Sequence, residues 1–140
     1  MVPFKVRRID HVVLRVRDLD RSIRFYETVL GCCVERRRPD LGLVHLRAGS
    51  SLIELVDVAG SLGLPGGPAP AAGARNMDHL CLRVEPFDEQ ALRRHLGAHG
   101  LAPRGPVVQN FGAEGVGPAL TIEDPDGNVV ELEGPAAEAE

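Results

Sequence analysis

Hydrophobic and polar positions alternate in short stretches along this chain, and two of these stretches occur twice. Residues 9–16 recur as residues 77–84, with Asp, His, Leu, Arg and Val at matching positions. Residues 52–56 resemble residues 129–133, with a Glu at the centre of each. The His segment comes first and the Glu segment last in both halves, and this shared order indicates a duplicated module.

A helix and three short strands are predicted after each His segment. The first helix spans residues 21–30, with Asp18 or Asp20 as its N-cap and Gly31 as its end. The second spans residues 89–98, is capped by Asp88, and ends near Gly97 and Gly100. Strand-like runs follow the helices at 32–38, 42–47, 51–57, 102–109, 118–123 and 128–133. Each half is therefore predicted to be a βαβββ module.

The fold class expected from this order is α+β, with paired βαβββ modules forming a curved mixed sheet. We expect a first module at residues 7–58 and a second at 75–133. Between them, residues 59–74 are rich in Gly, Pro and Ala, as in a linker or mobile loop. Residues 134–140 form a tail expected to fray.

Composition narrows the functional classes. The chain has 140 residues, a net charge of −4, no Trp and one Tyr, which disfavours nucleic-acid binding. It lacks an apolar run long enough for a membrane helix, and its first ten residues lack the apolar core of a signal peptide, so a cytoplasmic location is expected. The three cysteines show no CxxC spacing and do not predict a disulfide framework.

The candidate chemistry lies on one face of the predicted strands. Alternation puts His11 and Arg15 on the face opposite Leu14 and Val16, and the second half repeats this around His79. Glu54 and Glu131 likewise oppose apolar neighbours. A single strand His is more often structural and a single strand Glu is usually solvated. The repetition instead favours one divalent ion (Zn, Ni, Fe or Mn) bound by His11, Glu54, His79 and Glu131.

Other polar features have simpler explanations. Arg36, Arg37 and Arg38 suit a solvated strand face, with an anion clamp as the alternative. His95 and His99 are four apart on a predicted helix but have no third ligand in the sequence pattern. His45 is expected to be structural or on the surface. Cys81 shares the His79 face and is expected to be a small packed residue.

Residues 7–133 resemble the vicinal oxygen chelate superfamily, and glyoxalase I most nearly. The resemblance rests on residues 10–26, on Ile53-Glu54-Leu55, on Asp78-His79-Leu80 and on the turn and strand at 123–132. It implies paired βαβββ modules around a metal cleft. It also implies a ligand set of His, Glu, His and Glu in chain order, which carries over to His11, Glu54, His79 and Glu131.

The implied activity is that of a lactoylglutathione lyase-like enzyme acting on a small substrate with vicinal oxygens, such as a thiol–2-oxoaldehyde hemithioacetal. Glu131 is then the catalytic base, and Arg15 and Arg75 bind substrate. Val58 and residues 110–117 depart from the usual glyoxalase pattern. Another enzyme of the superfamily (an extradiol dioxygenase or a thiol transferase to an antibiotic) and a non-catalytic binding protein remain alternatives. The resemblance also implies a homodimer.

Overall fold

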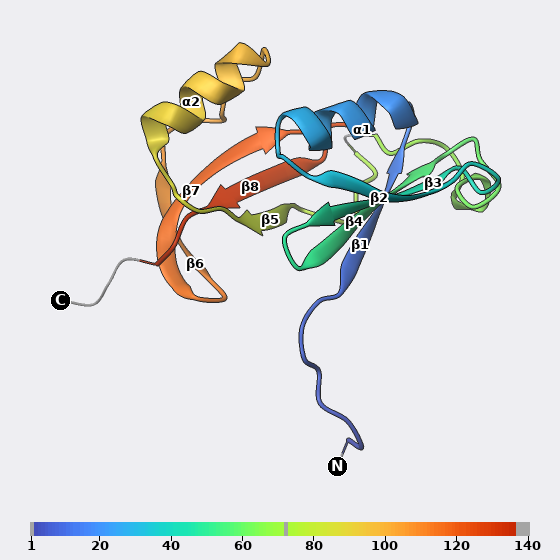
Figure 1. Cartoon of the computed structure of the whole chain (residues 1–140), viewed down its shortest axis with the longest axis horizontal. Helices are drawn as coiled ribbons and strands as arrows, with labels where there is room; N and C mark the ends of the chain where they lie inside the picture. Colours follow the sequence, from blue (N-terminus) through green and yellow to red (C-terminus); the bar gives the residue numbers. More distant parts are fainter. Residues whose placement is uncertain (1, 72, 137–140) are drawn as a thin grey trace. The chain divides into compact units, whose positions relative to one another are not determined.

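The computed structural model describes residues 2–71 and 73–136 (Figure 1). Contacts divide the chain into two units, Met1–Pro70 and Ala71–Glu140. Within the described residues each unit contains one α-helix and one four-stranded sheet, which confirms the α+β class. The helices of the described part are too short and too polar to cross a membrane.

The first unit has the predicted βαβββ order. Its elements are β1 (His11–Val16), α1 (Leu19–Thr28), β2 (Cys33–Arg38), β3 (Leu43–Ala48) and β4 (Ser51–Asp57). The sheet order is β1-β4-β3-β2, with β1 parallel to β4 and the other pairs antiparallel. The parallel pair places the first and last strands side by side, and these are the strands that carry His11 and Glu54.

Local sequence signals explain where α1 begins and how it packs. The carboxylate of Asp18 accepts the backbone N–H of Arg21 at 3.0 Å, so Asp18 is the N-cap and Asp20 lies in the first turn. Ile23 and Tyr26 are buried, as are Leu14 and Val16 on the apolar face of β1. This burial leaves the other face of β1, which carries His11, free of the core.

The second unit repeats the topology. Its elements are β5 (Leu80–Arg83), α2 (Glu89–Ala98), β6 (Val108–Gly112), β7 (Gly115–Glu123) and β8 (Val129–Glu133), in the sheet order β5-β8-β7-β6. Asp88 caps α2 as predicted, accepting the N–H of Ala91 at 3.0 Å. His79 comes directly before β5, whereas His11 begins β1.

The prediction of a strand at residues 102–109 was wrong for most of its length. Pro103 and Pro106 lack the N–H that a ladder needs, and Gly105 has a φ of +80°, so pairing begins only at Val108. The strand instead runs into residues 110–112 and turns through Gly115 (φ +110°) into β7. As a result Asn110 lies in the sheet, close to β8.

The turn before β8 is held by one buried carboxylate. Asp124 Oδ1 accepts the backbone N–H of Asp126 at 2.9 Å and that of Asn128 at 2.7 Å. Gly127 in this turn has a φ of +79°, which glycine adopts without a steric penalty. The turn therefore sets where β8 begins and, two residues into that strand, where Glu131 lies.

The segment predicted as a linker has structure of its own. It contains a short 3₁₀ helix at Leu64–Gly66, and residues up to Pro70 group with the first unit. Arg15 and Arg17 donate hydrogen bonds to carbonyl groups in this segment. In the predicted tail, residues 137–140 lie outside the described residues.

Candidate metal centre

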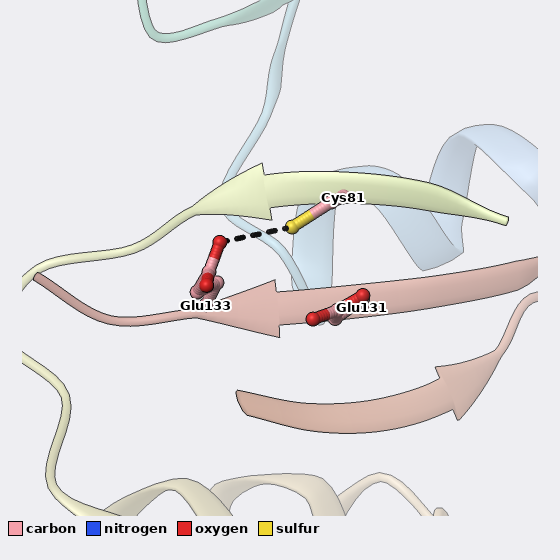
Figure 2. Close-up of side chains that lie close together, drawn as sticks. All are labelled: Cys81, Glu131 and Glu133. Atoms are coloured by element: carbon pink, nitrogen blue, oxygen red, sulfur yellow. Dashed lines mark hydrogen bonds between the residues drawn. The ribbon is translucent and has the colours of Figure 1, made fainter. Parts of the chain in front are cut away.

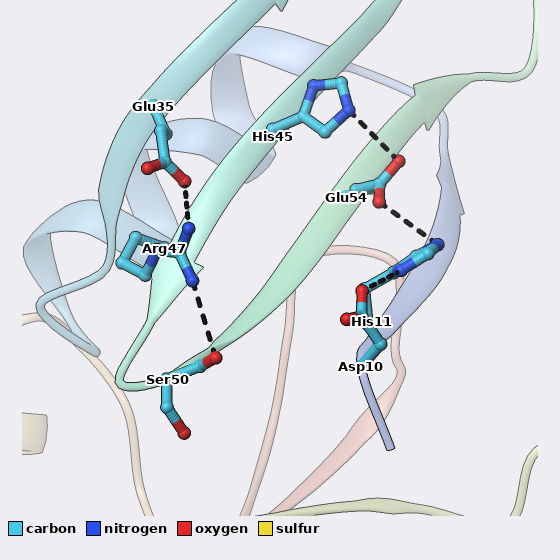
Figure 3. Close-up of polar contacts among 7 residues, drawn as sticks. All are labelled: Asp10, His11, Glu35, His45, Arg47, Ser50 and Glu54. Carbon is cyan, nitrogen blue, oxygen red and sulfur yellow. Dashed lines mark hydrogen bonds and ion pairs between the residues drawn. The ribbon is translucent and has the colours of Figure 1, made fainter. Parts of the chain in front are cut away.

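In the first unit the structure brings His11 and Glu54 together (Figure 3). The parallel register pairs Val13 with Glu54, so His11 reaches diagonally across to the carboxylate. The distance from His11 Nε2 to Glu54 Oε2 is 3.2 Å, and the Glu54 side chain is 11% exposed while that of His11 is 43% exposed. A sheltered carboxylate thus faces an accessible imidazole.

His45 is a third member of this group that the sequence prediction missed. It lies on β3 opposite Glu54, and its Nε2 is 3.4 Å from Glu54 Oε1. Its Nδ1 is buried and has no hydrogen-bond partner among the described residues. The signal was present in the sequence. A tight turn at Gly49 and Ser50 pairs Ala48 with Ser51, and that register places residue 45 opposite residue 54.

Figure 3 also shows the polar contacts of Arg47, which lies next to this group on β3. Arg47 pairs with Glu35 of β2 at 2.6 Å and donates to the carbonyl of Ser50 at 3.4 Å. These contacts join β2, β3 and the turn. They support the alignment of His45 with Glu54, although each involves exposed groups and contributes little to stability.

The second unit contains the equivalent pair. His79 Nε2 lies 3.1 Å from Glu131 Oε2, and the exposed fractions match those of the first unit, at 43% for the His side chain and 11% for the Glu. The other oxygen of Glu131 accepts a hydrogen bond from Asn110 Nδ2 at 2.9 Å. Sequence reasoning missed Asn110 because it left residues 110–117 outside the predicted strands. The residue opposite Glu131 on β7 is Thr121, so the position of His45 is not repeated.

Each histidine is oriented by the aspartate that precedes it. Nδ1 of His11 lies 2.8 Å from Asp10 Oδ1, and Nδ1 of His79 lies 2.8 Å from Asp78 Oδ1. The hydrogen bond to Asp10, with the nearby Glu54 carboxylate, raises the pKa of His11 above its ordinary value. The hydrogen bond to Asp78 does the same for His79, against partial burial and with a further contribution from Glu131.

These environments fit a divalent cation. Metal-binding histidines typically donate one ring N–H to a carboxylate, which directs the other nitrogen at the metal. In both units Nδ1 has that carboxylate and Nε2 points at a largely buried Glu. Each unit thus offers one imidazole nitrogen and one carboxylate, a donor set suited to Zn, Ni, Fe or Mn.

The two arginines predicted to bind substrate donate hydrogen bonds to backbone carbonyls and not to these His–Glu pairs. Arg15 Nη2 donates to the carbonyls of Gly63 at 2.9 Å and Gly67 at 2.6 Å, and Nη1 donates to that of Pro68 at 3.2 Å. Arg75 donates to the carbonyl of Gly127 in the turn before β8. Both guanidinium groups therefore hold backbone segments, and their binding of substrate stays a prediction.

The family model of the Glyoxalase/Bleomycin resistance protein/Dioxygenase superfamily matches residues 8–132. Together with the paired βαβββ units, this match shows that the chain belongs to that superfamily. Its members act on small molecules, commonly bind a divalent metal and often dimerise.

Two relatives share about a third of their aligned residues with this chain. The Glyoxalase domain-containing protein RDO1 of Mycosarcoma maydis is 35% identical, over 91% of this chain and 68% of that protein. Virulence protein STM3117 of Salmonella typhimurium is 32% identical, over 91% of this chain and 83% of that protein. The crystal structure of STM3117 matches with a TM-score of 0.76 over 95% of this chain and 100% of that one.

More distant structures share the fold. The lactoylglutathione lyase of Agrobacterium tumefaciens has a TM-score of 0.67 at 24% identity, covering 93% of this chain and 95% of that one. The fosfomycin resistance protein FosX of Mesorhizobium loti has a TM-score of 0.65 at 18% identity, covering 93% of each chain. Both likenesses show that the fold is shared, and a shared fold does not by itself define a reaction.

Proposed function

We propose that this protein is a metal-dependent, glyoxalase I-like lyase or isomerase. The observation that supports it best is the repeated Asp–His–Glu group, Asp10 with His11 and Glu54 and Asp78 with His79 and Glu131. The His–Glu distances match in the two units, at 3.2 and 3.1 Å. They are expected if both pairs serve one ion.

In this proposal His11, Glu54, His79 and Glu131 bind one divalent ion per chain, with the pairs supplied by the two modules. The ion would hold two adjacent oxygens of a substrate and stabilise negative charge on them. Asp10 and Asp78 keep the imidazoles oriented with Nε2 towards the ligand position.

Glu131 is the proposed base, taking a proton from one substrate carbon and returning it to the next. Its environment suits that role because one oxygen faces His79 and the other accepts from the neutral amide of Asn110. Glu54, by contrast, faces an imidazole on each side. We assign Glu54 to ligation alone.

The substrate class follows from the reaction. It is a small molecule with vicinal oxygens, such as the hemithioacetal of a thiol and a 2-oxoaldehyde. Arg15 and Arg75 are proposed to bind an anionic end of it, in addition to the backbone carbonyls that they hold. The lactoylglutathione lyase among the structural neighbours supports this class. Because FosX is a fosfomycin resistance protein, modification of an antibiotic, such as thiol transfer, is kept as the alternative reaction.

The test is an assay of the full-length protein after removal of metal and reloading with Zn, Ni, Fe or Mn. Hemithioacetals of glutathione and of other low-molecular-weight thiols are the substrates, with fosfomycin-dependent thiol loss and catechol-dependent oxygen uptake measured in parallel. We expect metal-dependent hemithioacetal conversion with at least one thiol. Activity only in a parallel assay, or none with any thiol, would contradict the glyoxalase-like proposal.

We also propose a homodimer, because members of the superfamily often dimerise. Modules could then pair within a chain or between two chains. Light scattering at micromolar concentration on the metal-loaded protein should give twice the 15.0 kDa chain mass. A strictly monomeric mass would exclude the dimer and require pairing within one chain.

A further inference from the structure

Beside the His79–Glu131 pair, the second unit gathers a separate group of ligand side chains (Figure 2). Cys81 lies on β5 opposite Glu131 of β8, and Glu133 follows two residues later on the same face of β8. One ligand atom from each of the three lies within 4.8 Å of the others. The parallel pairing of β5 with β8 therefore brings these three side chains together.

Glu133 is a buried carboxylate with few partners. Its side chain is 5% exposed, and its Oε1 has no hydrogen-bond partner among the described residues. Its Oε2 has only long contacts in the described structure, to Cys81 Sγ and Arg83 Nη2, both at 3.8 Å. Burying a carboxylate without compensation is costly, so the chemistry of the site calls for a positive or hydrogen-bonding ligand.

Arg83 lies too far from Glu133 for a hydrogen bond, with Nη2 3.8 Å from Oε2, and compensates its charge only weakly. Its Nε lies 2.7 Å from Glu114 Oε2, and its Nη1 donates to the carbonyl of Gly134. Three carboxylates, Glu114, Glu131 and Glu133, thus share one guanidinium and the His79 imidazole. Carboxylates therefore outnumber the basic side chains at this position.

Two further observations indicate a built site. Gly112 on β6 leaves room for the Glu133 carboxylate, which a Cβ at that position would overlap. The first unit has nothing comparable, because the residues equivalent to Cys81 and Glu133 are Val13 and Val56. The thiol and the extra carboxylate are therefore specific to the second module.

We propose that Cys81, Glu131 and Glu133 form a second cation site, for a borderline-soft divalent ion such as Zn²⁺ bound by one thiolate and two carboxylates. With Zn–S near 2.3 Å and Zn–O near 2.1 Å, tetrahedral ligand atoms lie roughly 3.5 Å apart. Cys81 Sγ and Glu133 Oε2 are already close to this spacing at 3.8 Å, and the other separations, each within 4.8 Å, would have to shorten by at most about 1.3 Å. The thiol proton is released to solvent on binding.

Two of the three proposed ligands, Cys81 and Glu133, do not belong to the His–Glu set. The second site can therefore be tested separately from the proposed function. Glu131 belongs to both sets, and binding a second ion through Oε1 would replace its hydrogen bond from Asn110. Cobalt is the informative probe because a Co²⁺–thiolate bond gives charge-transfer absorption in the near ultraviolet. The His–Glu set contains no sulfur and cannot produce that band.

Full-length apoprotein should be titrated with Co²⁺ while the sulfur band is recorded, and metal content should be measured after Zn²⁺ loading. We expect the band in wild type and in His11→Ala/His79→Ala, and its loss in Cys81→Ser. Cys33→Ser is the matched control and should keep the band, because Cys33 lies in the first unit and is exposed as Cys81 is. The exposure of Cys81 shows that the expectation of a packed residue at this position was wrong. Absence of the band in wild type, or its persistence in Cys81→Ser, would overturn the proposal.

Two more variants test Glu133 without removing the thiol. Glu133→Gln and Gly112→Ala should each weaken Co²⁺ binding about tenfold or more, the first by removing charge and the second by displacing the carboxylate. Thermal unfolding verifies that both are folded. If both are folded and bind Co²⁺ as wild type does, Glu133 is not a ligand. Loss of the band in His11→Ala/His79→Ala would make Cys81 a ligand of the first ion and exclude a second site.

Discussion

The two modules share a His–Glu pair but surround its carboxylate differently. Glu54 lies between the imidazoles of His11 and His45, whereas Glu131 lies between His79 and the amide of Asn110. The duplicated scaffold has kept the Asp, the His and the Glu and has changed the third partner. The shared residues fit a common task in binding, and the changed partners fit separate tasks for the two carboxylates.

The strands beside the pairs differ in a second way. Beyond its His–Glu pair the first unit has Val13 and Val56, while the second has Cys81 and Glu133. The matching arginines also differ, because Arg15 binds carbonyls of the segment after β4 and Arg83 binds Glu114. One module therefore presents an apolar surface beside its pair, and the other presents an acidic one.

The largest effect is expected where the modules are alike. His11→Ala/His79→Ala removes both nitrogen ligands. Removing only the hydrogen-bond partner of a metal ligand typically lowers metal affinity roughly 10–100-fold, and we expect the double variant to lower Ni²⁺ affinity by more than that. Isothermal titration with Ni²⁺ measures this. The matched control is His95→Ala/His99→Ala, a second histidine pair whose rings lie 4.9 Å apart on and next to α2. Equal Ni²⁺ affinity of the first variant and wild type would show that the His–Glu set is not the site.

A smaller effect should separate the two carboxylates. Glu131→Gln keeps a neutral oxygen ligand but cannot accept a proton, so turnover in the hemithioacetal assay should fall about 10²-fold or more while metal content falls modestly. Glu54→Gln should lower turnover much less, because Glu54 is assigned to ligation alone. If the two variants lose turnover equally, then Glu54 and Glu131 do not differ in role, and the assignment of Glu131 alone as the base is wrong.

The smallest effect concerns the arginine of the first module. Arg15→Ala leaves three carbonyls without their donor, and we expect the free energy of unfolding to fall by about 1–3 kcal/mol. If Arg15 also anchors the substrate, KM rises with kcat unchanged. Chemical denaturation and steady-state kinetics measure the two effects, with the exposed Arg36→Ala as control. Unchanged stability would mean that these hydrogen bonds contribute nothing to holding residues 63–68.

Periodicity predicted the βαβββ order and the apolar faces, because a strand buried on one face has apolar residues at every second position. It failed at β6, where Pro103, Gly105 and Pro106 interrupt a run that otherwise resembles a strand. His45 and Asn110 were missed because each meets a Glu on another strand, across a hairpin for His45 and across β7 for Asn110. For His45 the tight turn at residues 49–50 could have supplied the register, but for Asn110 no local signal did.

The contact between each histidine and the aspartate before it has an evolutionary consequence. Because the orienting carboxylate is the neighbouring residue, the direction of the imidazole is inherited with a dipeptide and needs no tertiary partner. A module that is duplicated or exchanged therefore keeps the orientation of its imidazole, with Nε2 directed at the ligand position. Recombination can test new combinations of such modules, within one gene or between subunits, without first having to rebuild the geometry of the ligands.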